Sequence, residues 1–585
     1  MIMRHILIDK IRVSGFRGLN DMEISLEQTT VLTGMNNAGK TSILKALQLA
    51  VGNRNYLSIE DLTIIEKGRA DKIVVDIRIV QLDDEGKLVE EFSEEWETIL
   101  KADRIKTDLD FAYVPLRTTL KYDPLTSKFN SKQEILNTWD PSEDKEWKDI
   151  VGKEKSFSFD EIPFFYIDAQ RDIIEDIKVR SSFLGKILSD VKYSSEDIAA
   201  LEELISEVNE QAIEKSPVLQ TIQTALEGLN TALNQTAGGV EITPFAKRIR
   251  DLNKGLSIHY SDGGNSFTMD YHGMGTRSWS SLLTLKAFIL HVKKLSQENE
   301  KPYFPIIAIE EPESHLHPNA QKRLYRQINN MPGQKIISTH SPYIAASAEL
   351  SEIRSVRKEG DTIKIGQIDI SHLNNDDKRK LRQKVINMRG EIFFSKALVL
   401  FEGETEEQAL PIFAEKHFGC VPSELGIDFI GVGGAGAYLP FLRFAEALNI
   451  PWYIFSDGEA DPIDKMGKTV KKLKDDDALD INAQSNVFII PNNDDFEKHI
   501  VNNGYLNDIN RYMKQTAISN CVNLQHKINV TRNFKNLTDI ELLGAAKSNK
   551  TEYSLIFANA ICNSSLALPP KVIDLFKKIK TDLGL

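Results

Sequence analysis

Eight residues near the start of the sequence have the composition and spacing of a loop that binds phosphate groups. Residues 34–41 read G-M-N-N-A-G-K-T and fit the pattern G-x-x-x-x-G-K-[ST] between an apolar strand and a helical segment. Glycines let backbone N–H groups approach phosphates, and the start of the helix adds its dipole. The lysine then reaches the terminal phosphates of ATP, and the threonine hydroxyl holds Mg²⁺. We therefore predict an ATP and Mg²⁺ site at Gly34, Asn36, Asn37, Ala38, Gly39, Lys40 and Thr41.

Polar residues also follow two apolar segments in the middle of the chain. One segment ends at Glu310 and Glu311, and the next leads to His340. A pair of acids in a turn is usually only solvated, but this pair directly terminates an apolar strand. We predict that Glu310 helps to hold Mg²⁺, that Glu311 polarises the attacking water and that His340 senses the γ-phosphate.

Further acidic residues end two apolar segments in the last third of the chain. The first precedes Glu402 and Glu406, and the second precedes Asp457 and Glu459. Carboxylates at the C-terminal ends of neighbouring parallel strands converge on one crevice, where divalent cations can neutralise their repulsion. Two such ions about 4 Å apart can activate water and stabilise a leaving oxygen in phosphodiester cleavage.

An α/β fold in two units is expected to position these residues. Alternating segments at 5–13 and 73–80 predict strands, whereas 175–236 carries apolar residues at helical spacing. That helical segment is either an arm for dimerisation or a set of helices packed on the same core. The predicted units are an ATPase domain, first part (1–174), a helical insertion (175–238), the second part of the ATPase domain (239–375), a linker (376–392) and a second α/β domain (393–585).

Composition is that of an ordinary globular protein of several domains. The 585 residues are 41% hydrophobic and 27% charged, and they exceed what one hydrophobic core supports. A net charge of −13 argues against a general positive coat, but it leaves room for a local basic groove. Three widely spaced cysteines and the lack of a long apolar run predict a reducing, cytoplasmic location without a membrane span.

The ATPase motifs resemble the ABC-type heads of the RecF and SMC group. The resemblance covers the opening FRGLNDMEISL, the phosphate loop, EEPESHLHP and STHSP. In that group a signature segment of one subunit completes the ATP site of another, which implies a homo-oligomer, either a dimer or a tetramer. Gly275, in GMGTRS, is the candidate for the signature, although it departs from the usual LSGG form. The resemblance also suggests Gln170 as a glutamine that senses the γ-phosphate and metal.

The second domain resembles the Toprim domain of topoisomerases, primases and nucleases. Toprim after an ABC-type head is similar to the OLD (overcoming lysogenization defect) family, which includes nucleases of the Gabija antiphage system and of retrons. This resemblance implies DNA as substrate and Mg²⁺, with Mn²⁺ or Ca²⁺ as alternatives at the Toprim site. It matches the metal ligands and bases of the family to Glu402, Glu406, Asp457, Glu459 and Glu497, and its basic residue to Lys550.

Several positions in this second site have alternatives. Glu459 stands where the family has aspartate, and Asp461 is its possible substitute. Lys547 is the runner-up to Lys550, and a solvated loop is the plain alternative for Asp495 and for both lysines.

Two hypotheses about function follow. The first is an ATP-regulated, metal-dependent DNA endonuclease that acts in antiphage defence, with a second defence protein or a nucleic acid as a further partner. The second is a regulatory ATPase scaffold whose Toprim domain holds a partner without cutting.

Overall fold

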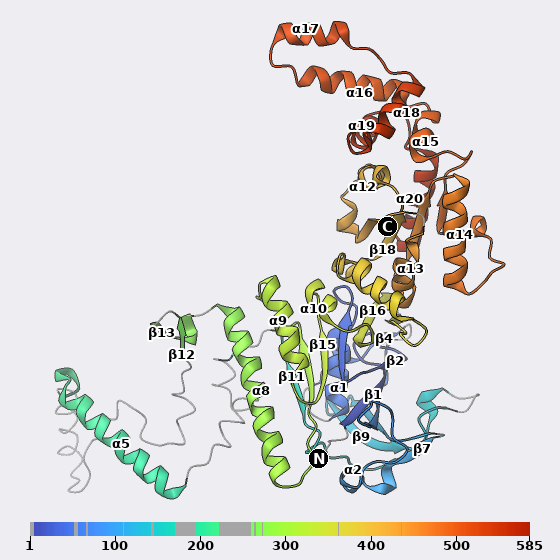
Figure 1. The fold of residues 1–585 in the computed structure, drawn as a ribbon. Coiled ribbons are helices and arrows are strands. Elements are labelled where there is room, and N and C mark those ends of the chain that lie inside the picture. Colours follow the sequence, from blue (N-terminus) through green and yellow to red (C-terminus); the bar gives the residue numbers. More distant parts are fainter. Residues whose placement is uncertain are drawn as a thin grey trace.

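The computed structural model describes residues 5–51, 57–65, 68–108, 110–141, 146–169, 173, 194–220, 259–262, 265–271, 273–360, 362–434 and 436–585. In these ranges an N-terminal body with two sheets lies below a smaller C-terminal body built around one sheet (Figure 1).

The first sheet is antiparallel and runs in the order β10-β9-β8-β6-β1-β2, with β7 on β8. The strands predicted at 5–13 and 73–80 are confirmed as β1 and β6. The strand bounds are β1 His5–Ser14, β2 Met22–Ser25, β6 Lys72–Leu82, β7 Lys106–Asp108, β8 Phe111–Asp123, β9 Lys128–Leu136 and β10 Gly152–Glu154.

The second sheet runs β11-β14-β15-β3-β16-β17 and is parallel except for β17. Its central strands β3 and β15 are buried along their whole length, as parallel strands covered on both faces are. The strand bounds are β3 Thr29–Thr33, β11 Phe164–Ile167, β14 Ile306–Glu310, β15 Gln334–Ser338, β16 Ile353–Glu359 and β17 Thr362–Gln367.

Helices cover these two sheets and fill the space between them. Leu44 and Leu47 of α1 share a hydrophobic core with Ile77 of the antiparallel sheet and Ala308 of the parallel sheet. The helices of this body are α1 Lys40–Ala50, α2 Glu94–Leu100, α8 Met274–Glu298, α9 Pro318–Asn329 and α10 Pro342–Ser347. The small remaining strands are β4 Ile64–Ile65 and β5 Gly68–Arg69.

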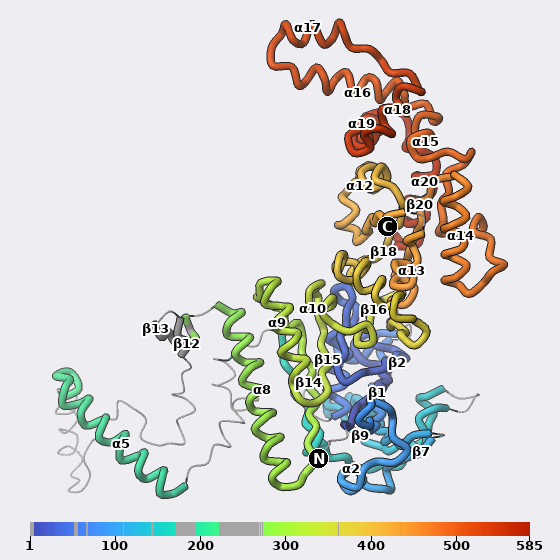
Figure 2. Tube along the Cα trace, viewed as in Figure 1, coloured from blue at the N-terminus to red at the C-terminus, as the bar shows by residue number. Residues whose placement is uncertain are grey.

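Part of the predicted helical insertion lies outside the described residues. Its described part contains α5 (Ser195–Glu214), whose N-terminal cap is Ser194, accepting a hydrogen bond from the Asp197 N–H. Beyond it, a two-stranded hairpin is formed by β12 (His259–Asp262) and β13 (Asn265–Thr268). The trace shows α5 well apart from the sheets (Figure 2).

The segment assigned to a linker from the sequence forms a helical joint between the two bodies. It comprises α11 (Asn375–Lys380), a π-helical turn (Leu381–Ile386) and a 3₁₀ turn (Gly390–Phe394). Leu381 and Val385 are buried in a core that includes Ile337 of the parallel sheet and Leu398 of the C-terminal body. One continuous core therefore joins the two bodies.

The C-terminal body contains a parallel sheet in the order β19-β18-β20-β21, followed by a run of helices. Its strands are β18 Ala397–Phe401, β19 Ile427–Gly431, β20 Trp452–Ser456 and β21 Val487–Ile489. Its helices are α12 Glu404–Phe418, α13 Tyr438–Ala447, α14 Ala460–Lys474, α15 Phe496–Asn502, α16 Leu506–Ser519, α17 Leu524–Asn533, α18 Asp539–Ser548, α19 Lys550–Cys562 and α20 Pro570–Leu583.

Candidate functional site

The loop between β3 and α1 has the backbone conformation that its glycines permit. Gly34 has φ 138° and Gly39 has φ 104°, values that other residues rarely adopt. A Cβ on Gly34 would lie 2.2 Å from the carbonyl oxygen of Val356, so no side chain fits there. Gly39 caps α1, and the free N–H groups at the start of the helix therefore face the loop. This is the geometry of an anion cradle.

Lys40 lies inside this cradle. Its Nζ donates hydrogen bonds of 2.8 Å to the carbonyl oxygens of Gly34 and Met35. Burial lowers the pKa of Lys40 to about 8, while the negative charges of Glu311 and Glu313 oppose the shift. Backbone carbonyl oxygens thus hold the amine where the terminal phosphates would bind. The negative charge of those phosphates would offset the free-energy cost of burying the ammonium group.

Thr41 and Glu310, predicted to hold Mg²⁺ together, are in direct contact. The Thr41 hydroxyl donates to Oε1 of Glu310, and the Tyr166 hydroxyl donates to Oε2 over 2.5 Å. Tyr166 was missed from the sequence, although it lies in β11, which pairs in parallel with β14. The tyrosine fixes the orientation of the carboxylate, as a residue behind a metal ligand does.

His340 lies beside the acids that end β14. Its Nε2 is 3.7 Å from Oε1 of Glu311, and burial lowers the pKa of His340 to about 4, with Lys40 adding to the shift. Glu311 has φ 42°, an uncommon backbone conformation of the kind found at functional sites. Because its pKa is lowered, the imidazole of His340 is neutral near pH 7 and can accept or donate a hydrogen bond without carrying charge.

Glu313 is a further residue of this site that sequence reasoning missed. Its Oε1 accepts hydrogen bonds from the Thr339 hydroxyl at 2.8 Å and from the His340 N–H at 2.6 Å. Burial raises the pKa of the Glu313 carboxyl. The available signal was its place two residues after Glu311, in the turn that faces the end of β15.

The two remaining residues predicted for the ATP site have different outcomes. Gln170 lies outside the described residues. Gly275 lies in the first turn of α8, where an added Cβ would be 2.5 Å from the carbonyl oxygen of His315. The close approach of α8 to residues 315–316 thus requires glycine here, and the predicted contact of Gly275 with a second subunit stays a prediction.

In the C-terminal sheet, two acids follow the strands at which the order of connections reverses. Strand β18 lies between β19 and β20. The first connection runs from β18 to β19 on one side, and the next returns to β20 on the other side of β18. Glu402 directly follows β18, and Asp457 directly follows β20. Such a reversal point at the carboxyl ends of parallel strands is where open α/β sheets bind ligands.

Glu402 and Glu406 are held in place by buried neighbours. The Tyr438 hydroxyl donates to Oε1 of Glu402 over 3.2 Å, and burial raises the pKa of this carboxyl. Glu406 is buried, and burial together with the charge of Asp457 raises its pKa to about 8. A Cβ on Gly403 would lie 2.4 Å from Oε2 of Glu406, so the glycine admits the carboxylate. Tyr438 was not predicted.

Asp457 and Glu497 lie close enough for their charges to interact. Burial raises the pKa of Asp457 to about 7, and the charge of Glu497 is the next cause. Glu497 accepts a 2.7 Å hydrogen bond from the Thr405 hydroxyl, and Lys550 Nζ lies 3.9 Å from the same oxygen. The structure thus places Lys550 beside the acids.

The alternatives considered at this site have separate positions. Lys547 pairs with Asp495 at 3.3 Å, and Asp495 caps α15 by accepting a hydrogen bond from the Lys498 N–H. Glu459 is exposed just before α14 and makes no side-chain capping bond. Asp461 pairs with Lys465 at 2.6 Å. Neither Glu459 nor Asp461 is among the main causes that shift the pKa of Asp457, although the charge of Asp461 adds to the raised pKa of Glu402.

The donor set of these acids fits a divalent cation, although within the described ranges no three side chains already stand at metal-binding spacing. Oδ1 of Asp457 is buried, and no hydrogen-bond partner is found for it among the described residues. The raised pKa values of Glu406 and Asp457 express repulsion and burial that a bound cation would relieve. Carboxylate oxygens are also the ligands that Mg²⁺ prefers.

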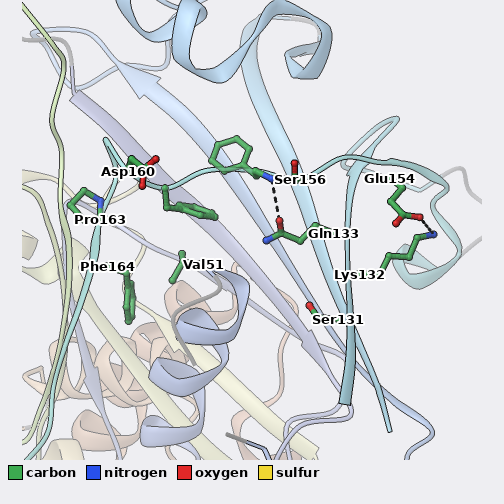
Figure 3. Close-up of a pocket in the computed structure, with 11 residues that line it drawn as sticks. Val51, Ser131, Lys132, Gln133, Glu154, Ser156, Asp160, Pro163 and Phe164 are labelled. Carbon is green, nitrogen blue, oxygen red and sulfur yellow. Dashed lines mark hydrogen bonds and ion pairs between the residues drawn. The ribbon is translucent and has the colours of Figure 1, made fainter. Parts of the chain in front are cut away.

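A separate hollow of about 700 Å³ opens at the edge of the antiparallel sheet (Figure 3). Val51 and Phe164 line one side, while Gln133 accepts a hydrogen bond from the Phe157 N–H on the other. None of the residues predicted for either site lines it. It therefore has no part in the chemistry described above.

The two bodies define a class: an ATPase domain followed by a Toprim domain. Residues 7–345 match the family model described as an AAA ATPase domain. Residues 393–458 match the model described as the TOPRIM domain of proteins like the overcoming lysogenization defect protein. The first match spans more than half of the chain, which therefore belongs to this AAA ATPase family, and the second shows that the chain also carries an OLD-like TOPRIM domain.

Relatives match over most of the chain. An OLD nuclease of Thermus scotoductus is 25% identical over 489 residues, which cover 78% of this chain and 83% of that protein. Endonuclease GajA of Bacillus cereus is 22% identical over 542 residues, covering 78% and 74% respectively. The solved C-terminal region of the Xanthomonas campestris OLD protein is 20% identical, with a TM-score of 0.25, and covers 33% of this chain and 97% of its own. Over the described ranges, no helix has the length and apolar character that a membrane crossing requires.

Proposed function

We propose that this protein is an ATP-regulated DNA endonuclease that depends on divalent metal and acts in antiphage defence. The observation that carries the proposal is the meeting of Glu402, Glu406, Asp457 and Glu497 at the reversal point of the C-terminal sheet, with Lys550 beside them. Gathering four carboxylates in one place destabilises the fold through repulsion and lost hydration, and a bound cation would offset this destabilisation.

Each residue has a role in the proposed cleavage of a phosphodiester bond. Glu402, Glu406, Asp457 and Glu497 would hold Mg²⁺, with Mn²⁺ or Ca²⁺ as alternatives. Bound there, such ions would lower the pKa of water and stabilise the leaving oxygen. Glu402 is the candidate base, since burial raises the pKa of its carboxyl and so makes the carboxylate a better proton acceptor. Lys550 would stabilise the negative charge that develops on the phosphate.

The proposed ATP chemistry uses the first site. Lys40 and the N–H groups of the loop would bind the phosphates, and Thr41 with Glu310 would hold Mg²⁺. Glu311 would polarise the attacking water, and His340 would hydrogen-bond the γ-phosphate.

Contacts between His340 and the joint support regulation of one site by the other. The ring of His340 lies 6.2 Å from the ring of Phe394, which comes three residues before β18. Arg357, on β16 of the ATPase sheet, donates to the carbonyl oxygens of Ser395 at 2.8 Å and Lys396 at 3.0 Å. A shift of His340 on nucleotide binding therefore has a short path to the strand that ends at Glu402.

We also propose a homo-oligomer, a dimer or a tetramer, formed through the ATPase heads and the helical insertion. Leu204 and Val208 of α5 are 56% and 52% exposed, and Asn209 is the buried residue recorded for this helix. An amphipathic helix left this exposed usually packs against another chain.

Cleavage of supercoiled plasmid tests the proposal directly. Wild-type protein, Lys40→Ala and Glu402→Ala are incubated with Mg²⁺ or Mn²⁺, with and without ATP. We expect Glu402→Ala to abolish nicking in every condition, and Lys40→Ala to remove only its response to ATP. Wild-type protein that binds metal and cuts no DNA in any nucleotide state would contradict the proposal.

That negative result would favour the second candidate, a regulatory ATPase scaffold with an inactive Toprim domain. The observation that favours it is the exposed position of Glu459 at the start of α14, where the family has aspartate. In that case, phage protection in cells would survive Glu402→Ala and Asp457→Ala but not Lys40→Ala.

A further inference from the structure

Two helices beyond the Toprim acids form a hairpin at the end of the molecule. Helices α16 and α17 contact each other and reach away from the C-terminal sheet, with α17 outermost (Figure 1). We call residues 506–538 the arm. Nothing in the proposed cleavage chemistry uses it.

The arm is locally basic within an acidic protein. The stretch 509–538 contains five lysines and arginines and no aspartate or glutamate, although acids make up 85 of the 585 residues. The same stretch holds twelve asparagine, glutamine, serine and threonine residues. Its basic residues are Arg511, Lys514, Lys527, Arg532 and Lys535.

Part of this positive charge is left uncompensated. Arg511 pairs with Asp508 and Lys535 pairs with Glu541, both at the root of the arm. For Lys514, Lys527 and Arg532, no acidic partner is found among the described residues. Lys527 and Arg532 are exposed and Lys514 is half-buried, so the outer part of the arm presents positive charge to solvent.

The arm also lacks the packing that normally holds a short helix. None of the ten residues of α17 is buried. At the tip, Val522 is 90% exposed and Leu524 is 74% exposed. A helix of this length is marginal in water without tertiary contacts, which points to a partner that covers it.

Charge and composition select that partner. A second copy of the arm would carry the same positive charge and repel the first. The phosphates of duplex DNA attract free lysines and arginines, and amide and hydroxyl side chains donate hydrogen bonds to phosphate oxygens. Exposed apolar residues at the tip of a basic hairpin can enter the minor groove and wedge between base pairs.

The root of the arm connects it to the acids. Ile509 of α16 shares a hydrophobic core with Phe557 of α19, and the two helices are in contact. Helix α19 begins at Lys550, whose amine faces Glu497. Duplex DNA bound along the arm would therefore reach the carboxylates at the first turn of α19.

We propose that the arm binds duplex DNA through Lys514, Lys527 and Arg532 and leads it to the Toprim acids. This proposal depends on the proposed function only in taking DNA as the substrate. Binding itself is independent of cleavage, so the two can be tested apart.

The test measures binding of a fluorescent DNA duplex by anisotropy in EDTA, where no metal-dependent cleavage occurs, over a range of salt concentrations. The test variant is Lys514→Gln/Lys527→Gln/Arg532→Gln. A matched control removes the same charge from three exposed lysines of the ATPase antiparallel sheet, Lys121→Gln/Lys128→Gln/Lys153→Gln. A second variant, Val522→Ser/Leu524→Ser, tests the apolar tip.

Each lost phosphate contact should reduce the slope of log affinity against log salt by about 0.9, so the triple arm variant should lose about 2.7. Between 50 and 200 mM salt, wild-type affinity should then fall by about 40-fold more than that of the arm variant. We expect the control to keep the wild-type slope, and the tip variant to bind more weakly with little change in slope.

Two outcomes would overturn the proposal. One is an equal salt slope in wild type and arm variant, even if wild-type protein cuts plasmid normally, which would leave the proposed function intact. The other is a change of oligomeric state by sedimentation in the tip variant with unaltered DNA binding, which would make the arm a contact between copies of the chain. Plasmid cleavage that fails while the slopes differ would instead reject the nuclease and keep the arm.

Discussion

The burial of Lys40 determines how ATP binding should depend on pH. Lys40 is 5% exposed, and burial lowers its pKa to about 8 in the protein without nucleotide. Bound phosphates would stabilise the protonated amine and raise that pKa again. Because ATP then prefers the protonated form, its affinity should fall as the pH rises above about 8.

The size of the effect follows from the lowered pKa. Lys40 is about nine-tenths protonated at about pH 7 and about one-tenth protonated at about pH 9. Affinity should therefore fall about tenfold across this interval, and binding at about pH 9 should take up about 0.9 proton. For the protein without ATP the sign is opposite: burying the charged amine costs stability below about pH 8, and that cost fades as the pH rises.

Isothermal titration calorimetry with MgATP, in buffers of different ionisation enthalpy, measures both the affinity and the proton uptake. Lys40→Met should bind weakly with no uptake at about pH 9, whereas Lys45→Met, on the same helix, should behave as wild type. His340 should not contribute, because its pKa is lowered to about 4. Equal wild-type affinity at both pH values, or uptake that persists in Lys40→Met, would refute the assignment of Lys40 as the buried phosphate ligand.

Three other changes have expected outcomes. Arg117→Met should lower the free energy of unfolding in urea by about 3–5 kcal/mol, because it leaves the buried carboxylate of Asp76 without the guanidinium that now donates to it at 2.7 and 2.8 Å. A loss below about 1 kcal/mol would contradict this. Gly275→Ala should lower the melting temperature, because its Cβ would meet the His315 carbonyl oxygen at 2.5 Å; an unchanged melting temperature with lost ATPase activity would favour the intersubunit role instead. Glu406 has a raised pKa, so it stabilises the metal-free fold at low pH and loses this effect as the pH rises through about 8. Glu406→Gln should flatten that decline in melting temperature, and a slope equal to wild type would show that another group causes it.

Much of the ATP site could be predicted because its motifs are local. Strand, glycine loop and lysine lie within a dozen residues, and the pairing of Thr41 with Glu310 follows once both strands are assigned to one sheet. Tyr166 could not be found in this way, because its contact with Glu310 depends on the register of β11 against β14. A tyrosine in an apolar strand looks like a core residue.

The joint and the second site show the same limit. The charged stretch from Asp376 to Lys384 suggests a solvated linker, yet Leu381 and Val385 are four residues apart and face a common core. Acids two residues apart after a strand suggest a shared site for Asp457 and Glu459, but Glu459 is the exposed residue that caps the start of α14. The position of Glu459 is therefore set by the start of α14, and the alternation of residues in β20 does not predict it.

The order of strands in the ATPase sheet has a consequence for synthesis of the protein. Strand β3 is made first, but its neighbours β15 and β16 lie about three hundred residues later, and β14 precedes them only slightly. The ribosome must therefore release the chain to about residue 360 before this sheet can close, and such distant pairing is slow. The Toprim strand β18 emerges soon afterwards, so the nuclease domain begins to fold on an ATPase core that is newly complete.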